Sequence, residues 1–421
     1  MRITQVLAVP VRTGFFADDQ AAIRIGAPAD GFTYAGTPVT PGFTSIRQAG
    51  EAVSVMFVLD DGYVAQGDCA AVQYSGVGGR DVLFRAQAGQ RMIAEHVAPL
   101  LAGRELTTFR ELAPALDALP VHTAVRYGIT QALLAAVAYE RRVTMAEVVR
   151  DEYETGVTLA PVPIFTQCGE ERYANVDKMI LKEADALPHG LINNVAERLG
   201  ADGELFQEYL RWVRDRILSL RPHPEYKPVL HFDTYGTIGL AFGMDTARMA
   251  DYLSRLGNLA APFRLRVEHP MDAGGREAQV EAMGKLRAAL RERGSATEIV
   301  VDEWCNTMED IRVFTDAQAA DVIHVKTPDL GGVNNTIDAL LYVRRQGLAA
   351  YCGGTCNETD LSARVCTHIA MACGAGQVLA KPGMGVDEGL MLVGNEMARV
   401  TALARARTLR LARRGARGRD R

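Results

Sequence analysis

Short apolar runs that stop on polar residues recur through the second half of the chain. The run that begins at Asp321 contains the β-branched residues Val322, Ile323 and Val325 and ends at Thr327-Pro328. Such residues favour a strand, and proline cannot donate the hydrogen bond that a central strand needs. The pattern therefore predicts a strand with Lys326 at its C-terminal end.

Three earlier runs end on carboxylates in the same way: Val229–Asp233, Arg264–Glu268 and Glu298–Asp302. The three acids follow one another after 35 and 34 residues, and Lys326 comes 24 residues after the last. A (β/α)8 barrel repeats about every 30 residues and carries its catalytic groups at the C-terminal ends of its strands. We therefore expect Asp233, Glu268, Asp302 and Lys326 to meet at one mouth.

The predicted barrel occupies residues 161–403. Its first strand is Pro161–Gln167 and its second is Lys178–Lys182, followed by the three acidic runs and the lysine run. Ala349–Cys352 and Gln377–Ala380 complete the eight strands that close such a barrel. Apolar stripes with helical spacing lie between the strands, at residues 205–220, 280–290 and 334–345.

Residues 1–160 are predicted to form a smaller α+β capping domain. Val53–Leu59 and Tyr63–Ala65 flank Asp60-Asp61-Gly62, which is typical of a β-hairpin. Helical periodicity follows from Val121 to Arg142. We expect the glycine-containing loop from Cys69 to Arg80 to be a flexible lid and the arginine-rich segment 404–421 to be disordered.

Composition narrows the class of protein. The chain has 421 residues, of which 48% are hydrophobic and 23% charged, and its net charge is −5. This balance argues against nucleic acid or a membrane surface as the main partner. We find no signal peptide and no long apolar span, and the seven cysteines form no CxxC pair, so we expect a cytoplasmic protein with free thiols.

The strand-end residues indicate a metal-assisted proton transfer. Three carboxylates without a histidine ligand suit Mg²⁺ better than Zn²⁺. Any one acid could merely cap a loop or a helix, but the near-regular spacing of three favours a metal site. A lysine beside a bound dication shifts towards its neutral form and can act as a base. The residues thus predict proton abstraction next to a carboxylate, through an enediolate.

These four residues resemble the active-site set of the enolase superfamily, in which an N-terminal α+β domain caps a modified (β/α)8 TIM barrel. Within that superfamily the chain resembles the methylaspartate ammonia-lyases from Met1 to about residue 403. The strings that carry this resemblance are Asp68–Gly76, Tyr127–Gln131, Leu187–His189, Asp302–Asn306, Lys326–Gly332, Gly353–Thr359 and Ala380–Asp387.

The resemblance implies a homodimeric, Mg²⁺-dependent carbon–nitrogen lyase, usually stimulated by K⁺. Such an enzyme converts L-threo-3-methylaspartate reversibly to mesaconate and ammonia in glutamate degradation. By resemblance, Lys326 takes the C3 proton and His189 hydrogen-bonds the metal-bound carboxylate. The implied Mg²⁺ ligands are Asp233, Glu268 and Asp302. The implied substrate contacts are Gln73 to the amino group, Gln167, Thr355 and Cys356 to the other carboxylate, and Phe165, Tyr351 and Leu379 around the methyl group.

One position departs from the family pattern. His324 stands where we expect a glutamine, two residues before Lys326. Alternate residues of a strand share a face, so His324 is predicted to face the site and contact the substrate. A histidine can still donate to a carboxylate, and it adds a pH dependence that glutamine lacks. Either the pocket binds the family's substrate with altered interactions, or the substrate differs.

Other interpretations stay open at this point. A different enolase-type reaction, such as epimerisation, dehydration or cycloisomerisation, could use Lys182 as a second base. A metal-stabilised scaffold without turnover would be unaffected by Lys326→Ala. From the residues alone, His189 could be a loop histidine, the two glutamines turn or strand residues, and Phe165, Tyr351 and Leu379 core residues.

Overall fold

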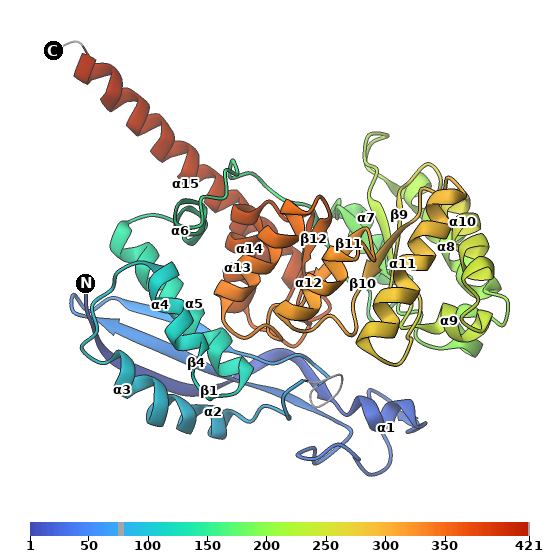
Figure 1. The fold of residues 1–421 in the computed structure, drawn as a ribbon, viewed down its shortest axis with the longest axis horizontal. Coiled ribbons are helices and arrows are strands. Elements are labelled where there is room, and N and C mark those ends of the chain that lie inside the picture. Colours follow the sequence, from blue (N-terminus) through green and yellow to red (C-terminus); the bar gives the residue numbers. More distant parts are fainter. Residues whose placement is uncertain (75–79, 420–421) are drawn as a thin grey trace.

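The computed structural model describes residues 1–74 and 80–419, which fold as two units side by side (Figure 1). The first contains a three-stranded antiparallel sheet with helices, and the second is a closed barrel of eight parallel strands. The predicted combination of an α+β unit and a (β/α)8 barrel is therefore confirmed. Among the described residues, no helix is long and apolar enough to cross a membrane.

The N-terminal sheet has the strand order β1–β4–β5, with β1 at Ile3–Asp18, β4 at Arg47–Leu59 and β5 at Val64–Cys69. The predicted hairpin joins β4 to β5, and Gly62 adopts the positive φ of 88° in its turn. The long helix α5 (Thr123–Arg141) packs on β5. The other elements of this unit are α1 (Gln20–Arg24), β2 (Ala29–Asp30), β3 (Thr33–Tyr34), α2 (Ala86–Met92), the π-helix Ile93–Val97, α3 (Ala98–Leu101), α4 (Phe109–Asp117) and α6 (Met145–Glu152).

Glycine allows α5 to lie directly against β5. A Cβ atom on Gly67 would lie 2.2 Å from the carbonyl oxygen of Gly128, and one on Gly128 would lie 2.4 Å from Sγ of Cys69. Real Cβ atoms do not approach other atoms so closely. The close contact between α5 and β5 therefore depends on these two glycines.

The barrel closes in the order β10–β11–β12–β13–β6–β7–β8–β9. Its strands are β6 (Ile164–Phe165), β7 (Ala186–His189), β8 (Val229–Asp233), β9 (Leu265–Glu268), β10 (Glu298–Val301), β11 (Val322–Val325), β12 (Ala349–Cys352) and β13 (Gln377–Leu379). All neighbouring pairs are parallel, so the C-terminal ends lie at one mouth.

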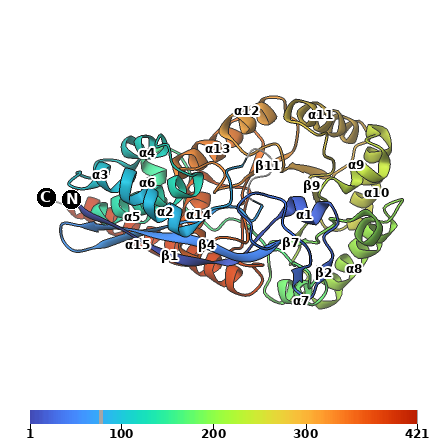
Figure 2. The same ribbon diagram turned by 90° about the horizontal axis from the view of Figure 1, so that it is seen from below.

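Helices surround the barrel and bury its outer face (Figure 2). They are α7 (Ala174–Leu181), the π-helix Val195–Leu199, α8 (Glu204–Leu220), α9 (Thr237–Phe242), α10 (Thr246–Ala260), α11 (Arg276–Glu292), α12 (Met308–Asp316), α13 (Val333–Arg345) and α14 (Asp360–Cys373), and α15 (Glu388–Arg419) follows them. The three stripes predicted from apolar spacing correspond to α8, α11 and α13.

One predicted strand is wrong. Residues 178–182 lie at the end of helix α7, and the second barrel strand is β7, Ala186–His189. A short apolar run such as Met179-Ile-Leu181 fits a buried helix and a strand equally well. Pro188 lies within the true strand, where a proline normally argues against one. The barrel still has the predicted eight strands, and His189 is the last residue of the second one.

The last helix projects away from the body of the molecule (Figure 1). It continues through Arg419, whereas the sequence predicted a disordered end from residue 404. Arginine, leucine and alanine all have high helix propensity, which agrees with helical extension of this segment. The predicted limits of the domains, at residues 160 and 403, stay predictions.

Candidate active site

The four side chains predicted to converge lie at the mouth of the barrel. Asp233 ends β8 and is level with Glu268, which ends β9. Asp302 and Lys326 directly follow β10 and β11, and Lys326 Nζ lies 2.7 Å from Asp302 Oδ1. None of the four is more than 8% exposed. Three carboxylates and one amine are thus buried together where a barrel places its chemistry.

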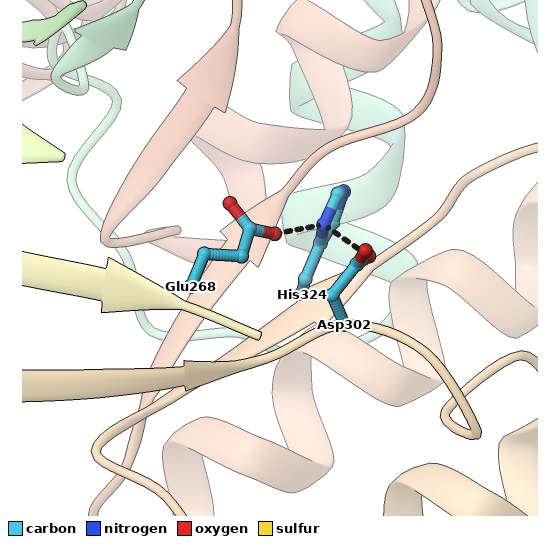
Figure 3. A group of neighbouring side chains, drawn as sticks. All are labelled: Glu268, Asp302 and His324. Atoms are coloured by element: carbon cyan, nitrogen blue, oxygen red, sulfur yellow. Dashed lines mark hydrogen bonds and ion pairs between the residues drawn. The ribbon is translucent and has the colours of Figure 1, made fainter. Parts of the chain in front are cut away.

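His324 lies between two of these carboxylates (Figure 3). Its Nδ1 is 2.7 Å from Glu268 Oε1 and 3.0 Å from Asp302 Oδ1. Its ring stacks on Tyr351, with 4.1 Å between the ring centroids. A Cβ on Gly353 would lie 1.8 Å from Nε2 of His324, so only glycine at 353 leaves room for the imidazole. His324 therefore faces the site, as its spacing from Lys326 predicts.

The donor atoms at the mouth fit a divalent cation. One potential ligand atom from each of Glu268, Asp302 and His324 lies within 4.8 Å of the others. This group differs from the predicted all-oxygen set, because it contains His324 and not Asp233. Asp233 nevertheless lies beside Glu268 on the adjacent strand. Three buried carboxylates at successive strand ends supply the oxygen-rich surroundings that Mg²⁺ prefers.

Burial is the largest single influence on the pKa of each of these groups. It raises the pKa of Asp233, and the neighbouring Glu268 adds to this effect. The pKa of Glu268 nevertheless falls to about 2, because His324 and His231 favour its charged form. Conversely, Glu268 and Asp302 raise the pKa of His324 to about 9 against the effect of burial. A protonated imidazole therefore balances part of the negative charge.

Lys326 has a second carboxylate partner that the sequence did not indicate. Glu303 Oε1 lies 3.3 Å from Nζ of Lys326. Although burial opposes it, the charges of Asp302 and Glu303 raise the pKa of Lys326. Arg80, from the N-terminal unit, pairs with Glu303 at 3.2 Å and with Asp329 at 2.8 Å. The N-terminal unit thus reaches the surroundings of the lysine.

His189 ends β7 and faces the carboxylates from the other side. Its Nε2 lies 3.4 Å from Asp233 Oδ2 and 3.5 Å from the hydroxyl of Tyr235. Its Nδ1 is buried and has no hydrogen-bond partner among the described residues. The backbone of His189 adopts a φ of 73°, a strained conformation that is common at functional sites. The nitrogen of His189 that faces the carboxylates is thus Nε2.

An apolar surface closes the interior of the barrel below these groups. Phe165, Tyr351 and Leu379 lie in one buried cluster with Ala186, Val300 and Val322. The rings of Phe165 and Tyr351 make an edge contact at 5.6 Å between centroids. The predicted wall residues are thus adjacent, and they also form part of the barrel core.

Among the remaining predicted contacts, Gln73 links the N-terminal unit to Thr355 and Cys356 of the barrel. The backbone N–H of Gln73 donates to Thr355 Oγ1 at 3.3 Å, and Sγ of Cys356 donates to Gln73 Oε1 at 3.2 Å. Gln167 follows β6 at the same end of the barrel and is partly buried. Five of the twelve residues of the predicted flexible lid, 75–79, lie outside the described residues.

One active-site neighbour that the sequence analysis missed had a usable signal. His231 is fully buried, with Nε2 2.8 Å from Glu268 Oε2 and Nδ1 3.0 Å from the amide nitrogen of Gln377. It precedes Asp233 by two residues on β8 and so shares its face. The rule that placed His324 beside Lys326 would also have placed His231 beside Asp233.

Lys182 does not lie at the mouth. It follows α7 on the outer surface, where its side chain is 43% exposed and pairs with Asp387. This placement follows from the mistaken strand at residues 178–182. The alternative reaction that used Lys182 as a second base therefore has no support in the geometry.

Sequence comparisons cover nearly the whole chain. Residues 1–154 match the family model of the methylaspartate ammonia-lyase N-terminus, and residues 156–406 match that of its C-terminus. A methylaspartate ammonia-lyase from Clostridium tetanomorphum is 59% identical over 408 residues, which is 96% of this chain and 99% of that protein.

Two solved structures from that family superimpose closely. One is a Mg complex of β-methylaspartase from Clostridium tetanomorphum, at 58% identity and a TM-score of 0.94, covering 97% of this chain and all of that chain. The other is a methylaspartate ammonia lyase from Citrobacter amalonaticus containing (2S,3S)-3-methylaspartic acid, at 51% identity and a TM-score of 0.94, covering 96% of this chain and all of that chain.

The fold extends to more distant proteins. An L-Ala-D/L-Glu epimerase from Bacillus subtilis has a TM-score of 0.63 at 15% identity, covering 93% of this chain and 91% of that chain. This likeness concerns the architecture alone, and it confirms the predicted enolase-like fold.

Proposed function

The chain belongs to the methylaspartate ammonia-lyase family and is an ammonia-lyase, and we propose that its barrel mouth converts L-threo-3-methylaspartate reversibly to mesaconate and ammonia. One observation carries the proposal: Lys326 lies 2.7 Å from Asp302, at the mouth where Asp233 and Glu268 end adjacent strands. A base beside three carboxylates is the arrangement that metal-assisted proton abstraction requires.

The proposed ligands of Mg²⁺ are Asp233, Glu268 and Asp302. When bound, Mg²⁺ supplies positive charge that attracts a substrate carboxylate, stabilises negative charge developing there and lowers the pKa of the nearby Lys326. The donor set supports this proposal because three oxygen ligands leave room for substrate and water. The Mg complex of the Clostridium relative also supports it.

Lys326 is the proposed base. In its neutral form it takes the proton from C3, and the electron pair of that C–H bond moves into the adjacent carboxylate to give an enediolate. That electron pair then forms the double bond between C2 and C3 as the C2–N bond breaks. The leaving nitrogen departs as ammonia, so atoms and charge balance. His189, whose Nε2 lies 3.4 Å from Asp233, is proposed to hydrogen-bond the metal-bound carboxylate next to C3.

The other predicted residues are proposed to orient the substrate. His324 faces the same space as Lys326 and can donate a hydrogen bond to a carboxylate. Gln73 is proposed to bind the amino group, and Gln167, Thr355 and Cys356 the second carboxylate. Phe165, Tyr351 and Leu379 offer an apolar wall to the methyl group.

A direct assay tests the proposed function. Purified protein with Mg²⁺ and 3-methylaspartate should show rising ultraviolet absorbance as the conjugated double bond of mesaconate forms, and EDTA should abolish the rise. Aspartate, which lacks the methyl group, is the matched comparison substrate. No absorbance change with 3-methylaspartate and Mg²⁺ would refute the proposal.

We also propose a cytoplasmic homodimer stimulated by K⁺, with domain limits near residues 160 and 403. The family membership supports these points, and the two family models meet between residues 154 and 156. All seven cysteines are buried free thiols, which suits a reducing compartment. Light scattering coupled to gel filtration tests the dimer, and assays with and without K⁺ test the stimulation.

A further inference from the structure

A buried ion pair between Asp18 and Arg47 lies next to Gln73. Asp18 is the last residue of β1, and Arg47 is its register partner on β4. Arg47 donates to both carboxylate oxygens of Asp18, with Nε at 2.8 Å and Nη2 at 2.7 Å. The Asp18 side chain is 2% exposed and that of Arg47 is 15% exposed. A planar guanidinium that binds both oxygens fixes the carboxylate in one orientation.

Arg47 is itself held in place. Its Nη1 donates to the carbonyl oxygen of Phe32 at 2.8 Å, and its guanidinium carbon lies 4.7 Å from the centroid of the Phe32 ring. The ring of Tyr34 lies 5.1 Å from the same carbon. The Asp18 carboxylate is therefore anchored by groups that belong to the N-terminal unit alone.

Asp18 dictates how the amide of Gln73 is oriented. Nε2 of Gln73 donates to Asp18 Oδ2 at 2.7 Å. An ionised carboxylate only accepts hydrogen bonds, so the amide must turn its NH2 group towards Asp18. Its carbonyl oxygen Oε1 then points the opposite way, towards Cys356 of the barrel at 3.2 Å. The oxygen and the NH2 group of an amide have nearly the same size, so packing does not distinguish the two orientations of the Gln73 amide. The charge of Asp18 therefore selects the observed orientation.

We propose that Asp18, held by Arg47, is a positioning residue that presents the carbonyl oxygen of Gln73 to the substrate and so selects a protonated amine. The inference rests on the proposed function, because it takes Gln73 as the contact to the amino group. An ammonium group carries only donors and is complementary to a carbonyl oxygen. If the Gln73 amide were reversed, its NH2 group would face the ammonium group of the substrate, and two hydrogen-bond donors would oppose each other.

Asp18→Asn tests the inference, because asparagine can accept from or donate to Gln73 and no longer selects one orientation. We expect kcat/KM for 3-methylaspartate to fall by about tenfold to a hundredfold, as for the loss of a hydrogen bond to a charged group. Methylsuccinate has the same dicarboxylate skeleton without the amino group, and its inhibition constant should change by less than about threefold. Asp30→Asn, at an exposed carboxylate of β2, is the matched control and should behave as wild type.

A second substitution distinguishes a positioning role of Asp18 from a purely structural role. Gln73→Glu alone sets two carboxylates against each other and should weaken 3-methylaspartate binding. In the double variant Asp18→Asn/Gln73→Glu, asparagine can donate to one oxygen while the other still accepts from the ammonium. The double variant should therefore bind 3-methylaspartate better than either single variant does.

The outcomes are distinguishable. Equal loss for 3-methylaspartate and methylsuccinate in Asp18→Asn would show a purely structural role and overturn the inference, as would no loss for either compound. A double variant weaker than both single variants would also overturn it. If the wild-type protein made no mesaconate from 3-methylaspartate, the proposed function would fail first, independently of any Asp18 variant.

Discussion

Nζ of Lys326 lies 2.7 Å from Oδ1 of Asp302, so the proposed base and a proposed metal ligand share one ion pair. The charge on the lysine and the occupancy of the metal site are therefore linked. The lysine ammonium and the His324 imidazole both pair with Asp302. A dication that binds Asp302 competes with both of them.

Lys326→Ala should remove most activity and leave the fold intact. Loss of a general base typically costs about a hundredfold to ten-thousandfold in rate. Mesaconate formation measures the rate, and circular dichroism checks the fold. Lys182→Ala is the matched control, because that lysine lies on the outer surface beside Asp387 and should retain wild-type activity. Equal activities of the two variants would contradict the assignment of the base.

The protein stripped of metal should lose stability as the pH rises from about 6.5 to about 9. The ordinary pKa of histidine is about 6.5, and beside Glu268 and Asp302 the pKa of His324 is about 9, so folding favours its protonated form. This contribution is complete below about pH 6.5 and is lost as the pH passes through about 9. Thermal unfolding in EDTA across this range measures it.

His324→Gln provides the comparison for that pH series, because glutamine does not titrate. Its unfolding temperature should vary less between pH 6.5 and 9 than that of the wild type. His223→Gln, at an exposed histidine, should keep the wild-type slope. Parallel curves for wild type and His324→Gln would exclude His324 as the titrating group.

Lys381→Met should destabilise the protein more than a double replacement of its ion pair. Lys381 and Glu358 are fully buried, with Nζ 2.8 Å from Glu358 Oε1 and 2.8 Å from the carbonyl oxygen of Gly353. Removing one partner of a buried pair costs about 3–5 kcal/mol, whereas replacing both with apolar residues costs far less. Denaturant midpoints of Lys381→Met and Lys381→Met/Glu358→Leu measure the difference. A double variant as unstable as Lys381→Met, or less stable, would contradict this.

Mg²⁺ should raise the unfolding temperature of the wild type. A ligand at about 100 times its dissociation constant stabilises a protein by about 2.7 kcal/mol. Glu268→Gln should reduce this shift strongly, because it removes a charged oxygen ligand from the buried group. Glu277→Gln, at an exposed carboxylate of α11, should leave the shift unchanged. A full Mg²⁺ shift in Glu268→Gln would place the cation elsewhere.

Much of the barrel mouth could be predicted because its signals are local. Asp233, Glu268 and Lys326 each end a short apolar run, and the rule that alternate residues share a face extends this to His324 and also to His231. Local signals failed at residues 178–182, where a buried helix end and a strand have the same apolar pattern. There, only packing in three dimensions distinguishes the two.

The supporting network could not be predicted, because its members lie far apart in the sequence. Asp18 and Gln73 are separated by 55 residues, and Tyr127 donates at 2.7 Å to Glu358, which is 231 residues away. No periodicity relates such positions. They become neighbours only when the N-terminal unit docks on the loop that follows β12, where Gly14 N–H donates to the carbonyl oxygen of Glu358 at 2.8 Å.

Strand β1 belongs to the N-terminal sheet and ends at Asp18, which contacts Gln73. The proposed base and metal ligands all belong to the barrel. The proposed recognition of the amine and the proposed breakage of the C–H bond therefore reside on separate parts of the polypeptide. Substitutions within residues 15–47 and 71–74 should therefore alter recognition of the amine while leaving the proposed proton-transfer groups in place.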